Sequence, residues 1–323
     1  MYMKGDVTRD LTNSISINTL FNPETSINSG QMFLWEKLDD AWYGIYGNHV
    51  LKFSRLKKSN GGANNSKERI SIKNDDFEFF SMPEIKGWQR ILFRLDDDIE
   101  KILSGFSKDA FISKVRRSYP GLRLMRQEPQ QCMLSFVCAS NTNILVIRTM
   151  LKNLSKKFGS KLRVDGKEFF SFPDAHRINK ASVDELRSCL LGYRTKAIKA
   201  VAQRLVSGDL DIKYLSNASY EDAKKELMKV YGIGNKIADC IMLFSLEKLE
   251  AFPIDVWITR ALSWHYSWLF TRIEGENKKI TPKISSKQYE VLSDVVRNYF
   301  GKYSGYAQQY LFYHMRQEAA KKW

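Results

Sequence analysis

The chain has 323 residues, 43% of them apolar and 13% aromatic, and its 51 basic and 36 acidic side chains give a net charge of +15. This composition is typical of a globular chain with a substantial core and excludes an intrinsically disordered protein. No apolar run approaches the ~18 residues of a membrane span and no apolar signal core follows Met1, so we expect a soluble protein with no membrane partner.

The positive charge is concentrated in the C-terminal part of the chain. Residues 1–117 hold 18 basic and 16 acidic side chains, whereas residues 118–323 hold 33 and 20. Such an asymmetry favours a polyanionic partner, with nucleic acid as the first candidate. Charge alone is equally compatible with a basic surface that serves solubility.

The four cysteines restrict the class of protein further. They are Cys132, Cys138, Cys189 and Cys240, all in apolar stretches, and no two form a CxxC pair. No zinc site or four-cysteine iron–sulfur cluster is therefore spelled out, and buried, reduced thiols are favoured. We expect a reducing compartment, which is the cytoplasm or nucleoid of a prokaryote or the nucleus of a eukaryote.

The first part of the chain predicts strands. Residues 32–56 contain short runs of aromatic and β-branched residues, interrupted by turn signals at Asp39-Asp40 and Gly47-Asn48. The polar, glycine-rich segment 57–76 is predicted to be an exposed loop.

The remainder predicts helices. A helical stretch covers 98–103, the first domain closes near Arg117, and nearly everything from Tyr119 onward has helical periodicity or caps. The predicted helices cover 128–137, a segment ending at Phe158 before Gly159, a stretch after the capping box of Ser182 and Glu185, 195–208, 220–230 after Ser219, a segment from Asn235, 286–300 and 306–321. The predicted fold class is α+β: an N-terminal domain with a mixed, antiparallel sheet over 1–117, then a mostly α-helical domain over 118–323.

A glycine-rich hairpin lies inside the helical domain. The sequence YGIGNK joins two predicted helices over 221–246 and contains Gly232, Gly234 and Asn235. Two glycines at this spacing allow positive φ on both sides of a tight turn and leave backbone N–H groups uncovered at a helix start, where a phosphate can bind. The hairpin therefore predicts a sequence-independent contact with DNA, and a purely structural turn is the alternative.

Lys236 and Asp255 begin two successive helices. At the start of an apolar helix, the dipole and desolvation both disfavour the charged form of Lys236 and favour a free, nucleophilic amine. Asp255, in the sequence Pro-Ile-Asp-Val, is expected at a helix cap as an ionised carboxylate. One helix and one loop separate the two residues, so we expect both side chains in one cleft. Alone, Lys236 is explained by a phosphate contact and Asp255 by capping.

The hairpin resembles the signature of the helix–hairpin–helix DNA glycosylases, and a lysine at this position marks the bifunctional members. Over most of its length the chain resembles the 8-oxoguanine DNA glycosylase/lyase family. The matching blocks occur in the family's order and are SGQMFLW (29–35), LMRQEPQQCMLSFVCASNTNI (124–144), LLGYRTKAI (190–198) and GYAQQYLF (305–312).

The resemblance implies a catalytic pair and a base pocket. Lys236 matches the nucleophile that forms a Schiff base, and Asp255 matches its carboxylate partner. Cys240 and Phe312 match the residues that pack on the two faces of the extruded base. Ordinary core packing is the alternative for Cys240 and Phe312.

The resemblance also implies how the damaged base is recognised. Guanine N7 is an acceptor, whereas the 8-oxo base carries N7–H. Gly30 matches the residue whose backbone carbonyl accepts this proton, and Gln308 matches the amide that reads the Watson–Crick edge. A glycine turn and a solvated glutamine are the alternatives.

Three positions match residues that contact the opened duplex: Asn141, Tyr193 and Arg194, the last as a reader of the unpaired cytosine or as a phosphate ligand. Two positions depart from the family. Val146 stands where a second cytosine-reading arginine is expected, which predicts a weaker preference for cytosine opposite the lesion. Trp257 stands where the animal members have histidine, so a phosphate contact there is not predicted.

The expected function is therefore excision of 8-oxoguanine from duplex DNA, followed by β-elimination at the abasic site. The expected enzyme is monomeric and needs no organic cofactor or catalytic metal; a monovalent ion at the hairpin is implied only by family analogy. A monofunctional alkylpurine glycosylase and a non-catalytic helix–hairpin–helix DNA-binding protein are the alternatives. Lys236 disfavours the first, and base release would exclude the second.

Overall fold

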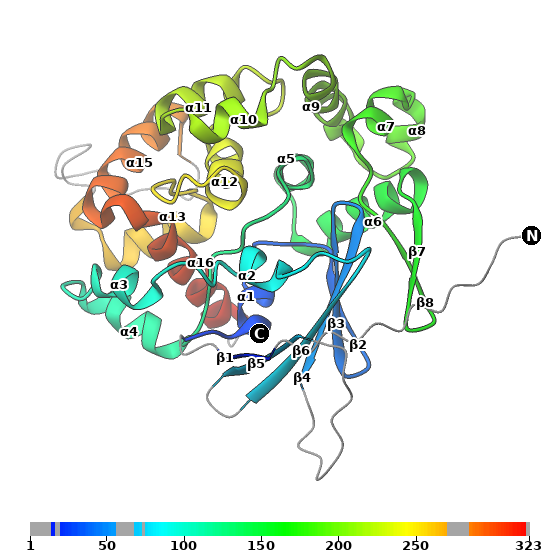
Figure 1. The fold of residues 1–323 in the computed structure, drawn as a ribbon. Coiled ribbons are helices and arrows are strands. Elements are labelled where there is room, and N and C mark those ends of the chain that lie inside the picture. Colours follow the sequence, from blue (N-terminus) through cyan, green and yellow to red (C-terminus); the bar gives the residue numbers. More distant parts are fainter. Residues whose placement is uncertain (1–13, 17–19, 56–67, 73–74, 270–283, 321–323) are drawn as a thin grey trace, which may run out of the picture.

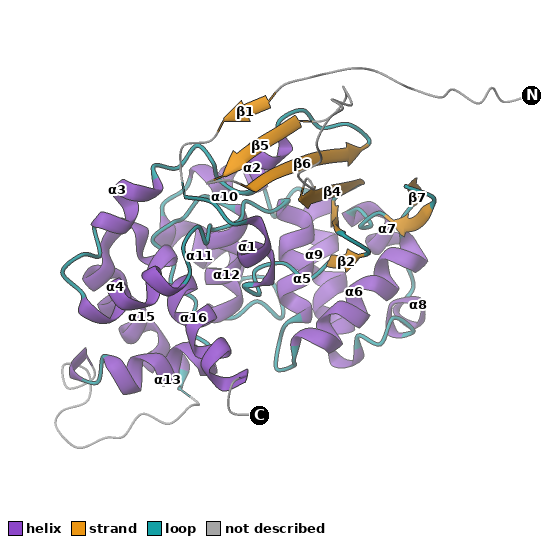
Figure 2. Cartoon of the chain, turned by 90° about the horizontal axis from the view of Figure 1, so that it is seen from below, coloured by secondary structure: helices purple, strands orange, loops and turns teal. Residues whose placement is uncertain are grey.

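The computed structural model describes residues 14–16, 20–55, 68–72, 75–269 and 284–320. Figure 1 follows the chain from the sheet through the helices, and Figure 2 shows the six-stranded sheet on one side of the molecule with helices on the other. The predicted α+β class, a largely antiparallel sheet followed by helices, is confirmed. In the described part of the chain, no helix combines the length and apolar character that a membrane crossing requires.

The N-terminal sheet has the strand order β1-β5-β6-β4-β3-β2. Only β1 and β5 pair in parallel, and the other neighbours are antiparallel. The six strands are β1 (Ser14–Ser16), β2 (Trp35–Leu38), β3 (Ala41–Tyr46), β4 (His49–Arg55), β5 (Glu68–Ile72) and β6 (Asp75–Met82). Leu38 pairs with Ala41 and Tyr46 with His49, so both predicted two-residue turns are confirmed.

The prediction of a loop over 57–76 is wrong for part of that segment. β5 and the start of β6 lie within it, whereas 56–67 and 73–74 lie outside the described residues. The sequence ERISI alternates polar residues with isoleucines, which is a strand pattern. The segments on both sides are polar and rich in lysine and asparagine, so the whole stretch was predicted to be a loop.

Alternation along the strands divides the sheet between two cores. Leu51 and Phe53 point to one face and pack with residues of α1 (Pro23–Asn28) and α2 (Trp88–Leu92). Val50 and Tyr43 point to the other face and join the main core shared with the helices. The sheet is thus covered on both faces, and one of its faces shares the main core with the helices.

Most predicted helix signals are confirmed. The capping box of Ser182 and Glu185 forms, Ser219 caps its helix, and Gly208 ends another in the left-handed conformation. The helices after the sheet are α3 (Ile99–Ser104), α4 (Ala110–Ser118), α5 (Pro129–Cys138), α6 (Ile144–Phe158), α7 (Ala175–Lys180), α8 (Val183–Arg187), α9 (Thr195–Ser207), α10 (Ile212–Asn217), α11 (Tyr220–Met228), α12 (Asn235–Ser245), α13 (Val256–His265), α15 (Ser286–Phe300) and α16 (Ser304–Ala320). Two single 3-10 turns cover Gly192–Arg194 and Gly301–Tyr303.

One interruption of the helical part was not predicted. β7 (Lys161–Val164) and β8 (Lys167–Phe170) form an antiparallel hairpin between α6 and α7. Its turn residues Asp165 and Gly166 have φ of 52° and 72°, as expected for the Asp-Gly turn that favours hairpins. The expectation of helix from Tyr119 onward is therefore wrong here, and the Asp-Gly signal was sufficient to correct it.

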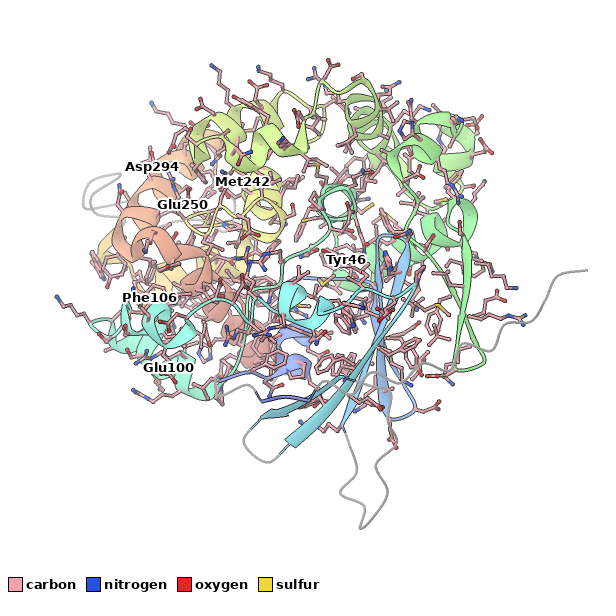
Figure 3. All side chains as sticks on the ribbon, in the orientation of Figure 1. Tyr46, Glu100, Phe106, Met242, Glu250 and Asp294 are labelled. Carbon is pink, nitrogen blue, oxygen red and sulfur yellow. The ribbon has the colours of Figure 1, made fainter. Side chains whose placement is uncertain are left out.

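The last helix closes the structure on the first domain. On α16, Tyr306 donates a hydrogen bond to Asp97, and Tyr310 donates to the carbonyl of Leu122. In Figure 3, side chains fill the interior around labelled Met242 of α12, while Asp294 of α15 lies at the surface. This closure brings residues from both ends of the chain to one pocket.

Candidate active site

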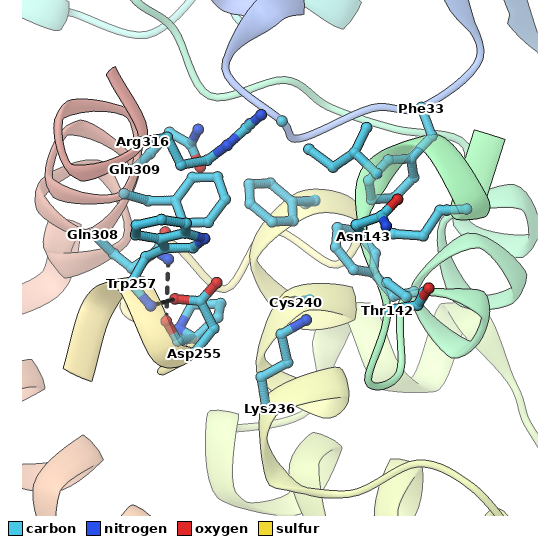
Figure 4. Close-up of a pocket in the computed structure, with 18 of the residues that line it drawn as sticks. Phe33, Thr142, Asn143, Lys236, Cys240, Asp255, Trp257, Gln308, Gln309 and Arg316 are labelled. Atoms are coloured by element: carbon cyan, nitrogen blue, oxygen red, sulfur yellow. Dashed lines mark hydrogen bonds between the residues drawn. The ribbon is translucent and has the colours of Figure 1, made fainter. Parts of the chain in front are cut away.

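A cavity of about 400 Å³ lies between the loop before β2, the α5–α6 turn, α12, the start of α13 and α16 (Figure 4). Six predicted site residues line it, and they are Gly30, Lys236, Cys240, Asp255, Gln308 and Phe312. Positions nearly three hundred residues apart therefore meet, as the resemblance implies.

Lys236 is the one residue of α12 that is only partly buried, whereas the others are buried. It stands in the first turn, and its Nζ lies 5.9 Å from the ring centroid of Phe136 on α5. Among the described residues, this amine forms no hydrogen bond or ion pair. The helix thus fixes the base of the side chain and leaves its nucleophilic end directed into the cavity (Figure 4).

Asp255 caps α13 as predicted. One carboxylate oxygen accepts hydrogen bonds from the backbone N–H of Trp257 and of Ile258, each at 2.9 Å. Burial raises the pKa of Asp255, whereas Lys236 and the two backbone amides act to lower it. The rise was not predicted from the sequence. Its second oxygen makes no hydrogen bond to a described residue, so it is available to a bound group.

A buried network holds the two helix starts in place. Asp239 of α12 is fully buried and accepts hydrogen bonds from Tyr220 and Tyr289, both at 2.6 Å. Lys224 supplies the opposite charge at 3.3 Å. Tyr289 also accepts from the backbone N–H of Ile254 at 3.1 Å. The network therefore connects α12 with the loop that ends at Asp255, the cap of α13.

Gly30 adopts a conformation that suits glycine. Its φ is +83°, and a Cβ there would lie 2.5 Å from Nη1 of Arg316 and 3.0 Å from Phe312. The preceding carbonyl, of Ser29, accepts a hydrogen bond from Gln309 at 2.9 Å. A side chain here would require a strained backbone and would displace the end of Arg316, whereas glycine lets this stretch of backbone approach a bound base.

Gln308, Phe312 and Cys240 shape the interior of the pocket. Gln308 donates to the carbonyl of Pro253 at 3.0 Å, and its buried Oε1 has no partner. That oxygen is therefore ready to accept a hydrogen bond from a ligand. Cys240 is 3% exposed, and burial raises its pKa to about 12, so the thiol is neutral and acts as a packing surface.

The three predicted duplex contacts gather at the α5–α6 turn. Asn141 is exposed with φ of 48°, and Tyr193 is 64% exposed and donates to the carbonyl of Ser140 at 3.0 Å. Arg194 is nearly buried; it donates to the carbonyls of Ser140 and Asn141 and lies over the Tyr193 ring. Arg194 thus supports this turn, while a contact with cytosine stays a prediction.

The hairpin is only partly as predicted. Gly232 has φ of +90°, and a Cβ would lie 2.3 Å from Cβ of Ala197 on α9. Gly234 instead is extended, so the expectation of positive φ at both glycines is wrong. No side chain caps α12, and nothing lies within 4 Å of a Cβ placed at Gly234. The Asn235 side chain bonds Ser286, which leaves only its backbone for a phosphate.

The two departures from the family pattern lie at the cavity rim and on α6. Val146 is 42% exposed in the first turn of α6. Trp257 lines the cavity, and the guanidinium of Arg260 lies 4.9 Å from its ring centroid. An arginine–indole pair therefore stands where the resemblance implies a histidine in the animal members.

Phe136 and Arg316 are pocket residues that the sequence analysis did not identify. Phe136 contacts the lysine from α5, and Arg316 enters the cavity from α16. Arg316 lies four residues after Phe312, so helical spacing was a signal that could have identified it. No comparable pattern distinguished Phe136 from the surrounding apolar core.

The donor set does not suggest a metal centre. Within the described ranges, no group of three or more His, Cys, Asp or Glu side chains is placed to hold an ion. All four cysteines are free and buried, as predicted. The cavity presents an amine, a carboxylate, amides and aromatic faces to a ligand.

A lysine and a carboxylate at two helix starts line one cavity beside an uncapped hairpin, which is the arrangement that the resemblance to the helix–hairpin–helix DNA glycosylases implies. Known sequences agree. The description "8-oxoguanine DNA glycosylase, N-terminal domain" matches residues 14–133, and "HhH-GPD superfamily base excision DNA repair protein" matches residues 134–287.

Individual relatives give the same result. A probable N-glycosylase/DNA lyase of Methanothermobacter thermautotrophicus is 28% identical over 245 residues, which cover 70% of this chain and 73% of that protein. An N-glycosylase/DNA lyase of Saccharomyces cerevisiae is 31% identical over 241 residues, 68% of this chain and 64% of the yeast protein.

Among solved structures, the Clostridium acetobutylicum 8-oxoguanine glycosylase/lyase, in complex with duplex DNA containing cytosine opposite 8-oxoguanine, superposes with a TM-score of 0.77. It is 29% identical, and the match covers 93% of each chain. The chain belongs to the 8-oxoguanine DNA glycosylase family.

Proposed function

We propose that this protein is a bifunctional DNA repair glycosylase that releases 8-oxoguanine from duplex DNA and cleaves the resulting abasic site by β-elimination. The observation that carries this proposal is the unpaired amine of Lys236, which shares one cavity with Asp255 and with Gly30. A monofunctional enzyme that activates water has no need of such an amine.

The residues support a sequence of bond changes. The Nζ lone pair of Lys236 attacks C1′ of the extruded nucleotide, and the C1′–N9 bond breaks with its electron pair leaving on the base. Asp255 stabilises the positive charge that develops on the sugar, while the departing base takes up a proton. The adduct loses a proton and opens to an imine; loss of a C2′ proton then expels the 3′ phosphate.

Recognition of the base is proposed to depend on two pocket oxygens that can each accept a further hydrogen bond. The carbonyl of Gly30 is proposed to accept N7–H, which guanine lacks, and Oε1 of Gln308 is proposed to accept from the Watson–Crick edge. Phe312 and Cys240 cover the two faces. Extrusion of the base costs about a few kcal/mol, which these contacts offset.

A weak preference for the base opposite the lesion is part of this proposal. One expected arginine is Val146, and the other, Arg194, already donates to two carbonyls of the α5–α6 turn. We further propose action as a monomer, because Lys236, Asp255, Gly30 and Gln308, which carry the proposed chemistry and recognition, line one cavity of the same chain.

A substrate panel tests the proposal. Purified protein is incubated with duplexes that carry 8-oxoguanine, 3-methyladenine or guanine at one position, and base release and strand cleavage are measured separately. We expect release of 8-oxoguanine with strand cleavage that needs no alkali. Release of the alkylated base alone, without strand cleavage, would identify the monofunctional alternative, and binding without any release would identify a DNA-binding protein.

A further inference from the structure

Arg316 is a cation in the pocket to which neither the proposed chemistry nor the sequence gives a role. It lines the cavity from α16, across from Lys236 (Figure 4). Its guanidinium carbon lies 5.5 Å from the Phe312 ring centroid, and among the described residues it forms no hydrogen bond or ion pair. Burial lowers the pKa of Arg316, and Asp255 partly opposes this effect. The donors of this guanidinium face the cavity, where a bound ligand can supply the acceptor.

Helix geometry gives the position of this cation relative to the base. Gln308, Phe312 and Arg316 are spaced four residues apart and lie on one face of α16, all lining the cavity. Eight residues of helix place Arg316 about 12 Å beyond Gln308. If Gln308 contacts the Watson–Crick edge and Phe312 covers the rings, Arg316 meets the opposite, imidazole side.

Gly30 lies on that same side. Nη1 of Arg316 is 2.5 Å from the position that a Cβ of Gly30 would take. A guanidinium donor and the Gly30 backbone therefore adjoin each other at one wall of the cavity. On the imidazole side of an oxidised purine, a donor (N7–H) likewise adjoins an acceptor (the oxygen on C8).

We propose that Arg316 donates a hydrogen bond to the exocyclic oxygen on C8 of the lesion, beside the N7–H that Gly30 accepts. The proposal rests on the proposed function and adds a second determinant of specificity. Guanine presents a bare acceptor at N7 and a C–H at C8, so both groups would face the wrong chemistry. The substrate class is accordingly a purine with a carbonyl at C8 and a proton on N7.

A DNA phosphate is the other acceptor that an arginine in this place could meet. The two are separable because an abasic site retains the phosphates and lacks the base. A contact with O8 affects base release alone, whereas a phosphate contact affects base release and abasic-site cleavage together.

The test compares Arg316→Leu and Arg316→Lys with the wild type on two duplexes, one with 8-oxoguanine and one with a preformed abasic site. Single-turnover rates and duplex affinity are measured for both. We expect Arg316→Leu to slow 8-oxoguanine release about 10- to 100-fold, the usual effect of a lost charge-assisted hydrogen bond. Abasic-site cleavage and the affinity for the abasic-site duplex should keep their wild-type values, which also shows that the variant is folded. Arg316→Lys, which retains the charge, should lie between.

Arg163→Leu is the matched control, because it removes an exposed arginine from β7; both its rates should be unchanged. Equal losses on the two duplexes in Arg316→Leu would assign Arg316 to the DNA backbone and overturn the proposal. No loss on either would also overturn it. A wild-type protein that cleaves abasic sites and leaves 8-oxoguanine in place would instead refute the proposed function, and this inference with it.

Discussion

Gln309 and Ser29, 280 positions apart in the chain, are joined by a buried hydrogen bond of 2.9 Å from the amide Nε2 to the backbone carbonyl. The bond fixes the peptide that leads into Gly30, so the C-terminal helix determines where the N-terminal part presents its backbone to the base. A loss of this bond should alter recognition more than chemistry.

Gln309→Leu should therefore reduce the rate of 8-oxoguanine release about 10-fold, since an unsatisfied buried carbonyl costs ~1–3 kcal/mol and frees the loop. Cleavage of a preformed abasic site should change little. Gln131→Leu is the control: it removes one buried and one partly buried hydrogen bond at the β3–β4 turn. Its melting temperature should fall while its specific activity is retained; equal activity losses in the two variants would contradict the assignment.

A comparison of Gly30 with Gly208 separates the effect of backbone strain from the effect of steric contact. Their φ values are +83° and +82°, but a Cβ at Gly208 has nothing within 4 Å. Gly208→Ala should cost only the strain of a left-handed alanine, about 1–2 kcal/mol, and leave activity intact. Gly30→Ala should pay the same strain and also displace Arg316 or Phe312, and we expect base release to fall by at least about 100-fold. Single-turnover assays with thermal melts on both variants measure the difference, and comparable activities would refute the steric account.

The raised pKa of Asp255 determines how its contribution to folding stability changes with pH. A carboxyl whose pKa is higher in the folded than in the unfolded protein stabilises the fold while protonated, and this contribution is lost as the pH rises from about 3.9 through the folded-state pKa. Asparagine also caps helices and carries no charge. Asp255→Asn should therefore melt higher than the wild type at neutral pH and release no base.

Melting curves from about pH 4, near the unfolded-state pKa, up to about pH 8 measure this effect. The advantage of Asp255→Asn should shrink as the pH falls, and a wild type more stable at neutral pH would contradict it.

Helix boundaries were predictable wherever one local interaction decides them. Ser182 with Glu185, Ser219 and Asp255 all accept the capping bonds that their positions indicated. The β7–β8 hairpin was not predicted, although the dipeptide Asp165-Gly166 is a hairpin signal. This short signal was overlooked because the segments on both sides have helical patterns. Gly234 was misassigned because extended and left-handed glycines are identical in sequence.

The pocket was predictable to the extent that matching blocks identified its residues. Arg316 was not found, because only the closure of α16 onto the loop of Gly30 places its guanidinium in the cavity. The engagement of Arg194 with two backbone carbonyls likewise depends on the path of the α5–α6 turn. The burial that raises the pKa of Asp255 is a property of the assembled fold, and no local pattern records it.

Val146 offers a gain-of-function test of the opposite-base preference. It is 42% exposed on α6, and Val146→Arg restores the side chain that the family pattern expects. Excision opposite cytosine should increase relative to excision opposite adenine by about 10-fold, since a good arginine–base pair contributes ~1–3 kcal/mol of discrimination. Leu145→Arg, at the neighbouring and more exposed position, should strengthen DNA binding without changing the ratio. An unchanged ratio in both variants would show that α6 does not face the opposite strand.

The central claim is that the amine of Lys236 becomes covalently joined to the sugar. The direct measurement is sodium borohydride reduction during reaction with an 8-oxoguanine duplex, analysed as a protein–DNA adduct by gel and mass spectrometry. The account predicts an adduct located at Lys236 in the wild type, and neither adduct nor base release in Lys236→Gln. Base release at the wild-type rate by Lys236→Gln, or an adduct at a different lysine, would contradict it.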